Sequence, residues 1–350
     1  MKGLLRVMSP FAPDQSGAAS VFYDMNAITV ICDAGGCTGN VCGFDEPRWQ
    51  KNARPIFSAG LRDMDAILGR DDRLVDKLKL VSDKSNADFA AIIGTPVPAV
   101  IATDFKALKK MASKRCGIPV VTCECTGTNL YDKGEEMAYL ELMKTFTRDM
   151  DVCEGRVGVL GATPLNFSDI EADRLIRKHY MEEGFSEVLV YGMGDGLDSV
   201  RMAASCEMNI VVSASGLAPA RWLKKNYGTP YRVECPFAGE AAAKAAGVLK
   251  HSKVLIVHEQ VAANSLRDAM EDCDVTVATF FTLDKNIANE GDVLVETETQ
   301  FIELVENGGY DAVICDELLR RAVKDGTYGI WINRRHFAVS GNLEEGLCEL

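Results

Sequence analysis

Short runs of β-branched and apolar residues alternate with helical patterns along most of this chain, and this alternation restricts the possible folds more than any other feature. The runs are bounded by Gly, Pro or Asp, as in AITVICDA at 27–34 and KVLIVHE at 253–259. Between them, a segment such as DIEADRLIRKHYMEEG at 169–184 begins with acidic residues and ends near glycine, as helices do. Alternating strands and helices are typical of parallel sheets with helices on both faces.

The predicted strands fall into three groups along the chain, which predict three α/β domains. Their expected boundaries are 1–152, 153–238 and 239–350. In such sheets, ligands bind in the crevice beyond the carboxyl ends of the strands. The strands are predicted at 27–34, 89–95, 118–124, 156–162, 187–193, 209–215, 253–259, 275–281 and 310–316, and helices at 169–184, 217–228, 239–252 and 262–273.

The charge of the chain argues against two classes of partner. The net charge is −13, whereas nucleic acids and anionic membrane surfaces are bound by basic faces. No run of about 18 apolar residues predicts a membrane span, and the N-terminus lacks the pattern of a signal peptide. We therefore expect a cytoplasmic protein. The GxxxxGK[ST] phosphate loop is absent, so we expect no nucleotide bound by this chain itself.

Three of the twelve cysteines fall in one glycine-rich stretch, VICDAGGCTGNVCGF at 30–44. Cys32, Cys37 and Cys42 are spaced C-x4-C-x4-C. In a reducing compartment such cysteines are poor candidates for disulfides, and thiolates are the usual ligands of iron–sulfur clusters. Glycines let the backbone approach a bulky group. The spacing by itself leaves two interpretations open, a cluster site and a glycine-rich turn with buried thiols.

Four ordered segments resemble the nitrogenase component 1 family. They read VICDAGGCTGN, FSAGLRDMDAILGRDDRLVDKL, ADFAAIIGTPVPAVIATDF and IPVVTCECTGTN. The family includes the molybdenum–iron protein subunits, the cofactor-assembly scaffold and the dark-operative protochlorophyllide and chlorophyllide reductases. The similarity continues through RVGVLGATP, MNIVVSASG and KVLIVHEQ, so that it covers essentially the whole chain, and CTGN at 37–40 is most similar to the scaffold loop.

The resemblance implies a fold class and a set of partners. The implied fold is α/β, with three Rossmann-like domains of parallel sheets around a central cleft. Two subunits, identical or related, would share a cluster at the interface of their first domains. Electrons would come from a separate, transiently bound iron protein that hydrolyses ATP.

The cysteines of this chain depart from the family pattern. Of the three ligand positions that the resemblance implies in the first domain, Cys37 matches one, and the others fall in SPFAPDQSG and near Thr95. Alternation along an extended segment places Cys123 and Cys125 on the same side. We therefore expect Cys37 and Cys125 from each of two chains to hold one [4Fe–4S] cluster on a twofold axis. Cys42 is the main alternative to Cys125, and Cys123 is a further candidate for binding the cluster.

A second site is implied in the central cleft, where the family holds a catalytic metallocluster with one cysteine and one histidine. The cysteine position matches Ser213, and the histidine position corresponds to His336. Without the cysteine, the resemblance favours a cleft open to an organic substrate, either a tetrapyrrole-like compound or a smaller molecule. Candidate lining residues are His336, His258, Glu259 and Arg221. The two histidines and Glu259 are also the candidates for supplying protons to a reduced substrate.

Two functions fit these features. The first is the catalytic component of a two-component, ATP-dependent oxidoreductase that reduces a substrate in the central cleft. The second is a scaffold or maturase that assembles a metallocofactor and transfers it. A protein that keeps the fold without a cluster is the third possibility.

Overall fold

The structure, a computed structural model, describes residues 2–238 and 249–344. Most of the predicted helix at 239–252, and the start of the predicted third domain at residue 239, lie outside the described residues.

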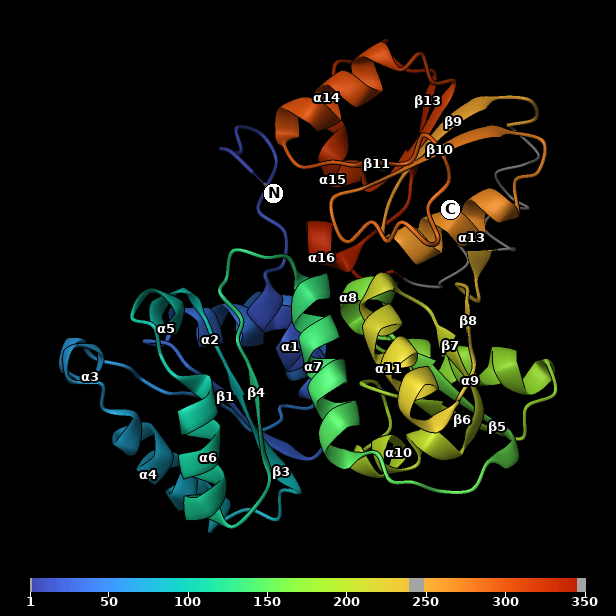
Figure 1. The fold of residues 1–350 in the computed structure, drawn as a ribbon. Coiled ribbons are helices and arrows are strands. Elements are labelled where there is room, and N and C mark those ends of the chain that lie inside the picture. The colour runs from blue at the N-terminus through green and yellow to red at the C-terminus, as the bar shows by residue number, and fades with distance from the viewer. Residues whose placement is uncertain (1, 239–248, 345–350) are drawn as a thin grey trace.

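Three separate sheets form the frame of the molecule, and every pair of neighbouring strands is parallel (Figure 1). Their strand orders are β2-β1-β3-β4, β6-β5-β7-β8 and β11-β10-β9-β12-β13. The predicted α/β fold with three Rossmann-like parallel sheets is confirmed. Each sheet lies within one of the three predicted residue ranges, whose boundaries stay predictions. The strands are β1 (Ala27–Ile31), β2 (Ile56–Ser58), β3 (Phe89–Ile93), β4 (Val120–Cys123), β5 (Cys153–Leu160), β6 (Glu187–Val190), β7 (Cys206–Val211), β8 (Tyr231–Val233), β9 (Lys253–Val257), β10 (Asp274–Thr279), β11 (Val293–Leu294), β12 (Ala312–Cys315) and β13 (Ile330–Asn333).

Helices connect the strands and pack on both faces of each sheet. The long helix α7 (Tyr131–Phe146) lies between the first and second sheets, and it packs against both α1 (Asp14–Phe22) and α11 (Leu217–Tyr227) (Figure 1). The other α-helices are α2 (Gly36–Asn40), α3 (Asp63–Leu68), α4 (Asp71–Ser82), α5 (Pro96–Val100), α6 (Phe105–Cys116), α8 (Pro164–Phe167), α9 (Ala172–Glu182), α10 (Leu197–Arg201), α13 (Gln260–Asp268), α14 (Glu298–Asn307), α15 (Glu317–Arg320) and α16 (Phe337–Ser340); shorter helical turns are η1 (Val41–Asp45), η2 (Pro47–Gln50), η3 (Ala203–Ser205) and η4 (Ala214–Gly216).

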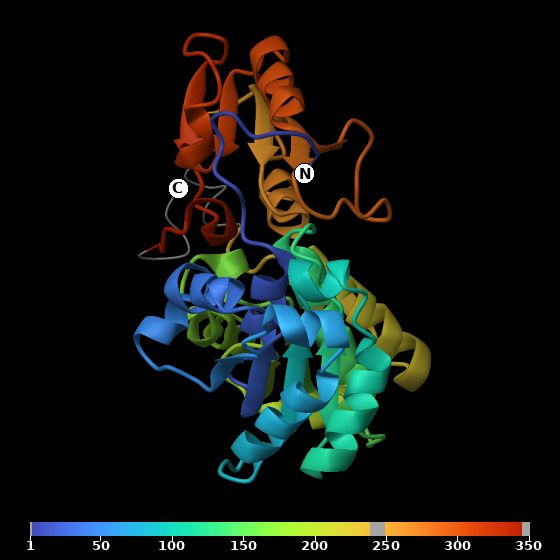
Figure 2. The ribbon, with the colours of Figure 1, turned by 90° about the vertical axis from the view of Figure 1, so that its left-hand side faces the viewer.

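The N-terminal segment leaves the first domain and packs on the third. The backbone amides of Arg6, Val7 and Met8 donate to the carboxylate of Glu298 on α14. Phe11 stacks edge-on against Phe280, with 5.0 Å between ring centroids. Figure 2 shows this segment running along the third domain before it enters α1. The first residues of the chain, which the sequence pattern grouped with the first domain, therefore contribute to the core of the third.

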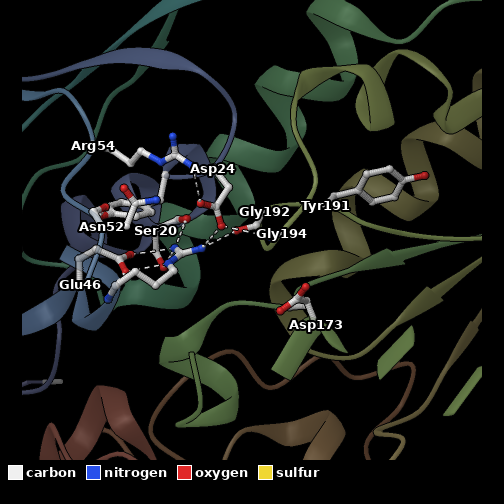
Figure 3. A network of polar contacts seen from close by, with 12 residues as sticks. Ser20, Asp24, Glu46, Asn52, Arg54, Asp173, Tyr191, Gly192 and Gly194 are labelled. Atoms are coloured by element: carbon white, nitrogen blue, oxygen red, sulfur yellow. Dashed lines mark hydrogen bonds and ion pairs between the residues drawn. The ribbon is translucent and has the colours of Figure 1, made fainter. Parts of the chain in front are cut away.

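A network of polar contacts around the buried Arg48 joins the first and second domains; Figure 3 shows the network, with Asp24, Glu46 and Gly192 labelled. The guanidinium of Arg48 binds Glu46 at 2.7 Å and Asp24 at 2.9 Å, and it donates to the carbonyl of Gly192 at 3.0 Å. Asp24 in turn accepts from the amide of Gly194 at 3.1 Å. Arg48 closely follows the glycine-rich stretch at 30–44, which we call the cysteine-rich turn. The network therefore fixes the end of this turn against the second sheet.

Within the part of the chain that the structure describes, no helix has both the length and the apolar character needed to cross a bilayer.

Candidate functional site

The cysteine-rich turn begins where β1 ends, and a buried aspartate shapes it. Asp33 accepts hydrogen bonds from the amide of Thr38 at 2.8 Å, from its hydroxyl at 3.0 Å and from the hydroxyl of Ser58 at 2.6 Å. The chain then forms α2 and η1 in succession. Gly35, which precedes α2, has φ +123°, a conformation that glycine adopts readily.

Cys37 and Cys42 lie in this turn and are partly exposed. Burial raises the pKa of both thiols, and the charges of Asp33 and Glu46 add to the effect at Cys37 and Cys42 respectively. Both thiols are therefore protonated at neutral pH unless a metal displaces the protons. A Cβ added at any of the neighbouring glycines would meet no heavy atom within 4 Å, so the turn has open space around it. These glycines are Gly35, Gly36, Gly39 and Gly43.

Cys123 and Cys125 lie in the core instead. Each is 1% exposed, and both belong to the apolar cluster that extends from the first domain into the second. Burial raises the pKa of both thiols. Cys32 is also buried, as expected from its place at the end of a strand. Burial therefore favours Cys42 over Cys125 as the thiol that accompanies Cys37 in any site open to a second subunit.

Within one protomer, the residues described contain no group of three or more His, Cys, Asp or Glu side chains that could hold a metal ion. Thr95 lies beside Cys37, where its hydroxyl contacts the thiol and donates to the carbonyl of Cys32 at 2.8 Å. Thr95 lies near the position at which the resemblance implied a further cysteine. A complete thiolate site would need ligands from a second chain.

Exposed apolar side chains occur in the turn itself and on the elements that follow β2 and β3. The carboxyl ends of parallel strands share one edge of a sheet, so these elements leave the same edge of the first sheet as the turn (Figure 1). Single exposed apolar residues are ordinary, whereas a group of them marks an interaction surface. We call this group the apolar face; its members are Phe44, Met64, Ile67, Leu68, Val97, Val100 and Ile101.

A second constellation lies where the three domains meet. The hydroxyl of Tyr131, at the start of α7, donates to Asn166 Oδ1 at 2.6 Å and lies 2.9 Å from His336 Nε2. Asn166, which follows β5, donates to Glu135 Oε2 at 2.8 Å and to Ser213 Oγ at 3.3 Å. The structure thus brings the two positions implied for the cofactor, Ser213 and His336, into one hydrogen-bonded network.

Glu135 is the acid of this network. Its carboxyl group accepts from Thr163 Oγ1 at 2.5 Å and from Ser215 Oγ at 2.8 Å, and Ser215 lies 2.7 Å from Ser213 Oγ. Burial raises the pKa of Glu135 to about 8, although these hydrogen bonds oppose the shift. The group is therefore largely protonated at neutral pH, and the two serine hydroxyls connect it to the junction.

His258 and Glu259 follow β9 and face the same junction. The rings of His258 and His336 stack with 4.4 Å between centroids, and burial lowers the pKa of both, that of His258 to about 3. Glu259 accepts from the amides of Ala214 at 2.7 Å and Ala262 at 3.0 Å, and burial raises its pKa to about 7. Both imidazoles are neutral, and neither Nδ1 atom has a hydrogen-bond partner among the described residues.

Among the residues that the structure describes, side chains fill the centre of the junction, which differs from the expected open cleft. The cavity lined by His258, Glu259 and Asn166 has a volume of about 10 Å³, room for about one water molecule. The side chains that fill the space are hydrogen-bonded to one another across the domains. Arg221, a further candidate for the cleft, instead forms an ion pair with Asp284 at 2.6 Å.

Several members of the network were missed from the sequence. Asn166 follows the strand β5, so the rule that ligands bind at the carboxyl ends of strands could have found it. Tyr131 and Glu135 lie one turn apart on α7. This helix contains many polar residues, and its sequence does not show which of them are buried. Their role depends on how α7 packs against two other domains.

Comparisons with known proteins agree with the α/β fold of three parallel sheets. Two solved structures of a protein named "Nitrogenase Cp1", one at pH 6.5 and one at pH 5, are similar to the chain. The first has a TM-score of 0.69 at 12% identity and covers 92% of this chain and 84% of its own; the second has a TM-score of 0.71 at 14% identity and covers 98% and 86%. No curated protein matches. The sequence profile of the family described as nitrogenase component 1 type oxidoreductase matches residues 15–304. The chain therefore belongs to the nitrogenase component 1 family of oxidoreductases.

Proposed function

We propose that this protein is the catalytic component of a two-component reductase and holds an iron–sulfur cluster between two subunits. Cys37 and Cys42 of each chain would supply the four thiolates of one [4Fe–4S] cluster, with Cys125 as the alternative to Cys42. The partner subunit is a second copy of this chain or a related one. Electrons would arrive from an ATP-hydrolysing iron protein, as the family resemblance implies; the absence of a Walker-type phosphate loop from this chain fits that partner.

One observation carries the proposal. The partly exposed thiols of Cys37 and Cys42 lie in a glycine-rich turn with open space around it, and the residues of the apolar face lie on elements that leave the same edge of the first sheet. An isologous dimer brings the same surface of both subunits together, so two thiols a chain become four. The donor set fits the group, because iron–sulfur clusters are held by thiolates.

When bound, such a cluster supplies one-electron transfer. The residues of this chain would position it and supply protons. Asp33 would hold the turn that carries Cys37, through its hydrogen bonds with Thr38 and Ser58. Glu135 holds a proton near neutral pH and is connected through Ser215 to Ser213. Since His258 and His336 are neutral, Glu135 is the better proton donor for a reduced substrate.

A second candidate function is a scaffold for cofactor assembly. CTGN at 37–40 is similar to the scaffold loop of the family, and the filled junction suits a protein that does not turn over a substrate there.

A reduction experiment separates the two. Protein purified without oxygen is mixed with an iron protein and ATP, and its visible and electron paramagnetic resonance spectra are followed. Reduction with all iron retained supports the reductase. Transfer of iron and sulfide to an apo-acceptor protein supports the scaffold, and the absence of iron in the purified protein contradicts both.

A further inference from the structure

A cavity of about 360 Å³ lies beside the central network, between the first and third domains. The turn Thr128–Leu130 and Lys133 line one side of it, and Phe280–Leu283 and Leu294–Glu296 line the other. Its volume is far larger than the space of about 10 Å³ at the centre of the junction. A ligand that cannot enter the filled centre has room here.

The inner wall of the cavity touches the proton-carrying network. Phe281 lines the cavity and contacts the rings of Tyr131 and His336, with centroid distances of 5.0 and 4.9 Å. A single phenyl ring therefore lies between the cavity and His336. The opposite wall begins at Thr128, three residues after Cys125 of the first domain.

The walls are held in place without a ligand. Asp14 accepts from the amides of Thr126 at 2.9 Å and Gly127 at 2.8 Å, which fixes the turn before Thr128. Asp132 accepts from both the amide of Thr282 at 2.9 Å and its hydroxyl at 2.5 Å, which joins the two walls. Preformed walls lower the entropic cost of binding.

The lining defines the chemistry of a ligand. Phe280, Phe281 and Val295 make an apolar floor. At the rim, Lys2 pairs with Glu296 at 2.6 Å, whereas the ammonium group of Lys133 forms a longer, partly exposed ion pair with Glu136 at 3.6 Å. Exposed ion pairs contribute little, so an anionic ligand can compete with Glu136 for Lys133.

We propose that this cavity binds a small organic anion, a carboxylate with an apolar or aromatic body, and is the substrate site of the reductase. The claim that the ligand is a substrate rests on the proposed function, whereas the claim that the cavity binds it does not. The volume lies near the lower end of the range for ligand sites, about 300–1,000 Å³. It suits a ligand of one or two rings and not the four linked rings of a tetrapyrrole. Phe281 would separate the bound molecule from His336.

Calorimetric titration with 4-phenylbutyrate, 4-phenylbutanol and protoporphyrin IX tests the inference on protein purified without oxygen. We expect the carboxylate to bind with a dissociation constant of roughly 1 mM or tighter, and the alcohol about fivefold more weakly. Leu294→Trp, which fills the cavity from a partly exposed position, should weaken the carboxylate at least about tenfold. Leu80→Trp on α4 is the matched control and should bind as the unaltered protein does.

The charge preference is tested separately. Lys133→Gln should bring carboxylate and alcohol to within about twofold of each other, and Lys144→Gln, on the same helix, should keep the fivefold preference. Absence of carboxylate binding, equal binding of acid and alcohol to the unaltered protein, or tight protoporphyrin binding that Leu294→Trp abolishes would each overturn the inference. Protein that binds the carboxylate but contains no iron would contradict the proposed function and leave the binding site intact. Protein that contains iron but does not bind the carboxylate would contradict the binding site and leave the proposed function intact.

Discussion

At the scale of single residues, Glu135 shows how burial sets the chemistry of the junction. An unfolded glutamate titrates near a pKa of about 4.3, whereas burial raises the pKa of Glu135 to about 8. Between these values the folded protein binds more protons than the unfolded chain. The contribution of Glu135 to stability is therefore fully present below the unfolded pKa and is lost as pH rises through the folded pKa.

The first prediction follows from this sign. Urea unfolding at pH 6 and at pH 8 measures how far the free energy of unfolding falls between these two pH values. We expect this fall to be about 2 kcal/mol smaller in Glu135→Gln than in the unaltered protein. Glu136→Gln, whose carboxylate is partly exposed near Lys133, should keep the original slope. Equal slopes in all three proteins would show that Glu135 is ionised in the folded state.

At the scale of elements, α1 and α7 pack in close contact through two glycines. A Cβ at Gly17 would lie 1.9 Å from the carbonyl oxygen of Tyr131, and one at Gly134 would lie 1.7 Å from that of Asp14. This contact places both residues: Asp14 holds the turn after Cys125, and Tyr131 binds His336.

Gly17→Ala should therefore lower the free energy of unfolding by about 1–3 kcal/mol, because the helices must separate. Gly39→Ala in α2 is the control. It meets no heavy atom within 4 Å and should be neutral or stabilise by up to about 1 kcal/mol through helix propensity. Measured by urea unfolding, a neutral result at Gly17 would contradict the packing described.

The sequence predicted elements well where each carries its own pattern. All nine predicted strands are present, because each has a run of buried apolar residues. The four that were missed, β2, β8, β11 and β13, lie at the edges of their sheets, and none is longer than four residues. An edge strand has a neighbouring strand on one side only and is less enclosed than a central strand, so its sequence needs less apolar character.

At the scale of the whole molecule, the domains are joined by buried polar groups that no local pattern reveals. Arg48 connects Glu46 and Asp24 of the first domain to the carbonyl of Gly192 in the second (Figure 3). The same reasoning applies to the candidate site. His258, Glu259 and His336 were predicted from strand ends and resemblance, whereas the filling of the cleft depends on side chains from three domains.

Arg48→Leu should lower the free energy of unfolding by about 3–5 kcal/mol, because it leaves two carboxylates without their partner. Arg54→Leu is the matched control, since Arg54 also approaches Asp24, but at 3.9 Å and about half exposed, and its loss should cost less than about 1 kcal/mol. Similar losses in the two variants, measured by chemical unfolding, would show that the buried position of Arg48 has no special role.

The central claim is that two copies of the cysteine-rich turn hold one cluster between them, and iron analysis of protein purified without oxygen tests it most directly. We predict a brown dimer with about four iron atoms, loss of the iron and its spectrum in Cys37→Ala, and no loss in Cys116→Ala, whose thiol is similarly half-buried on α6. Colourless protein without iron, or a Cys37→Ala variant with the full iron content and an unchanged spectrum, would contradict the account.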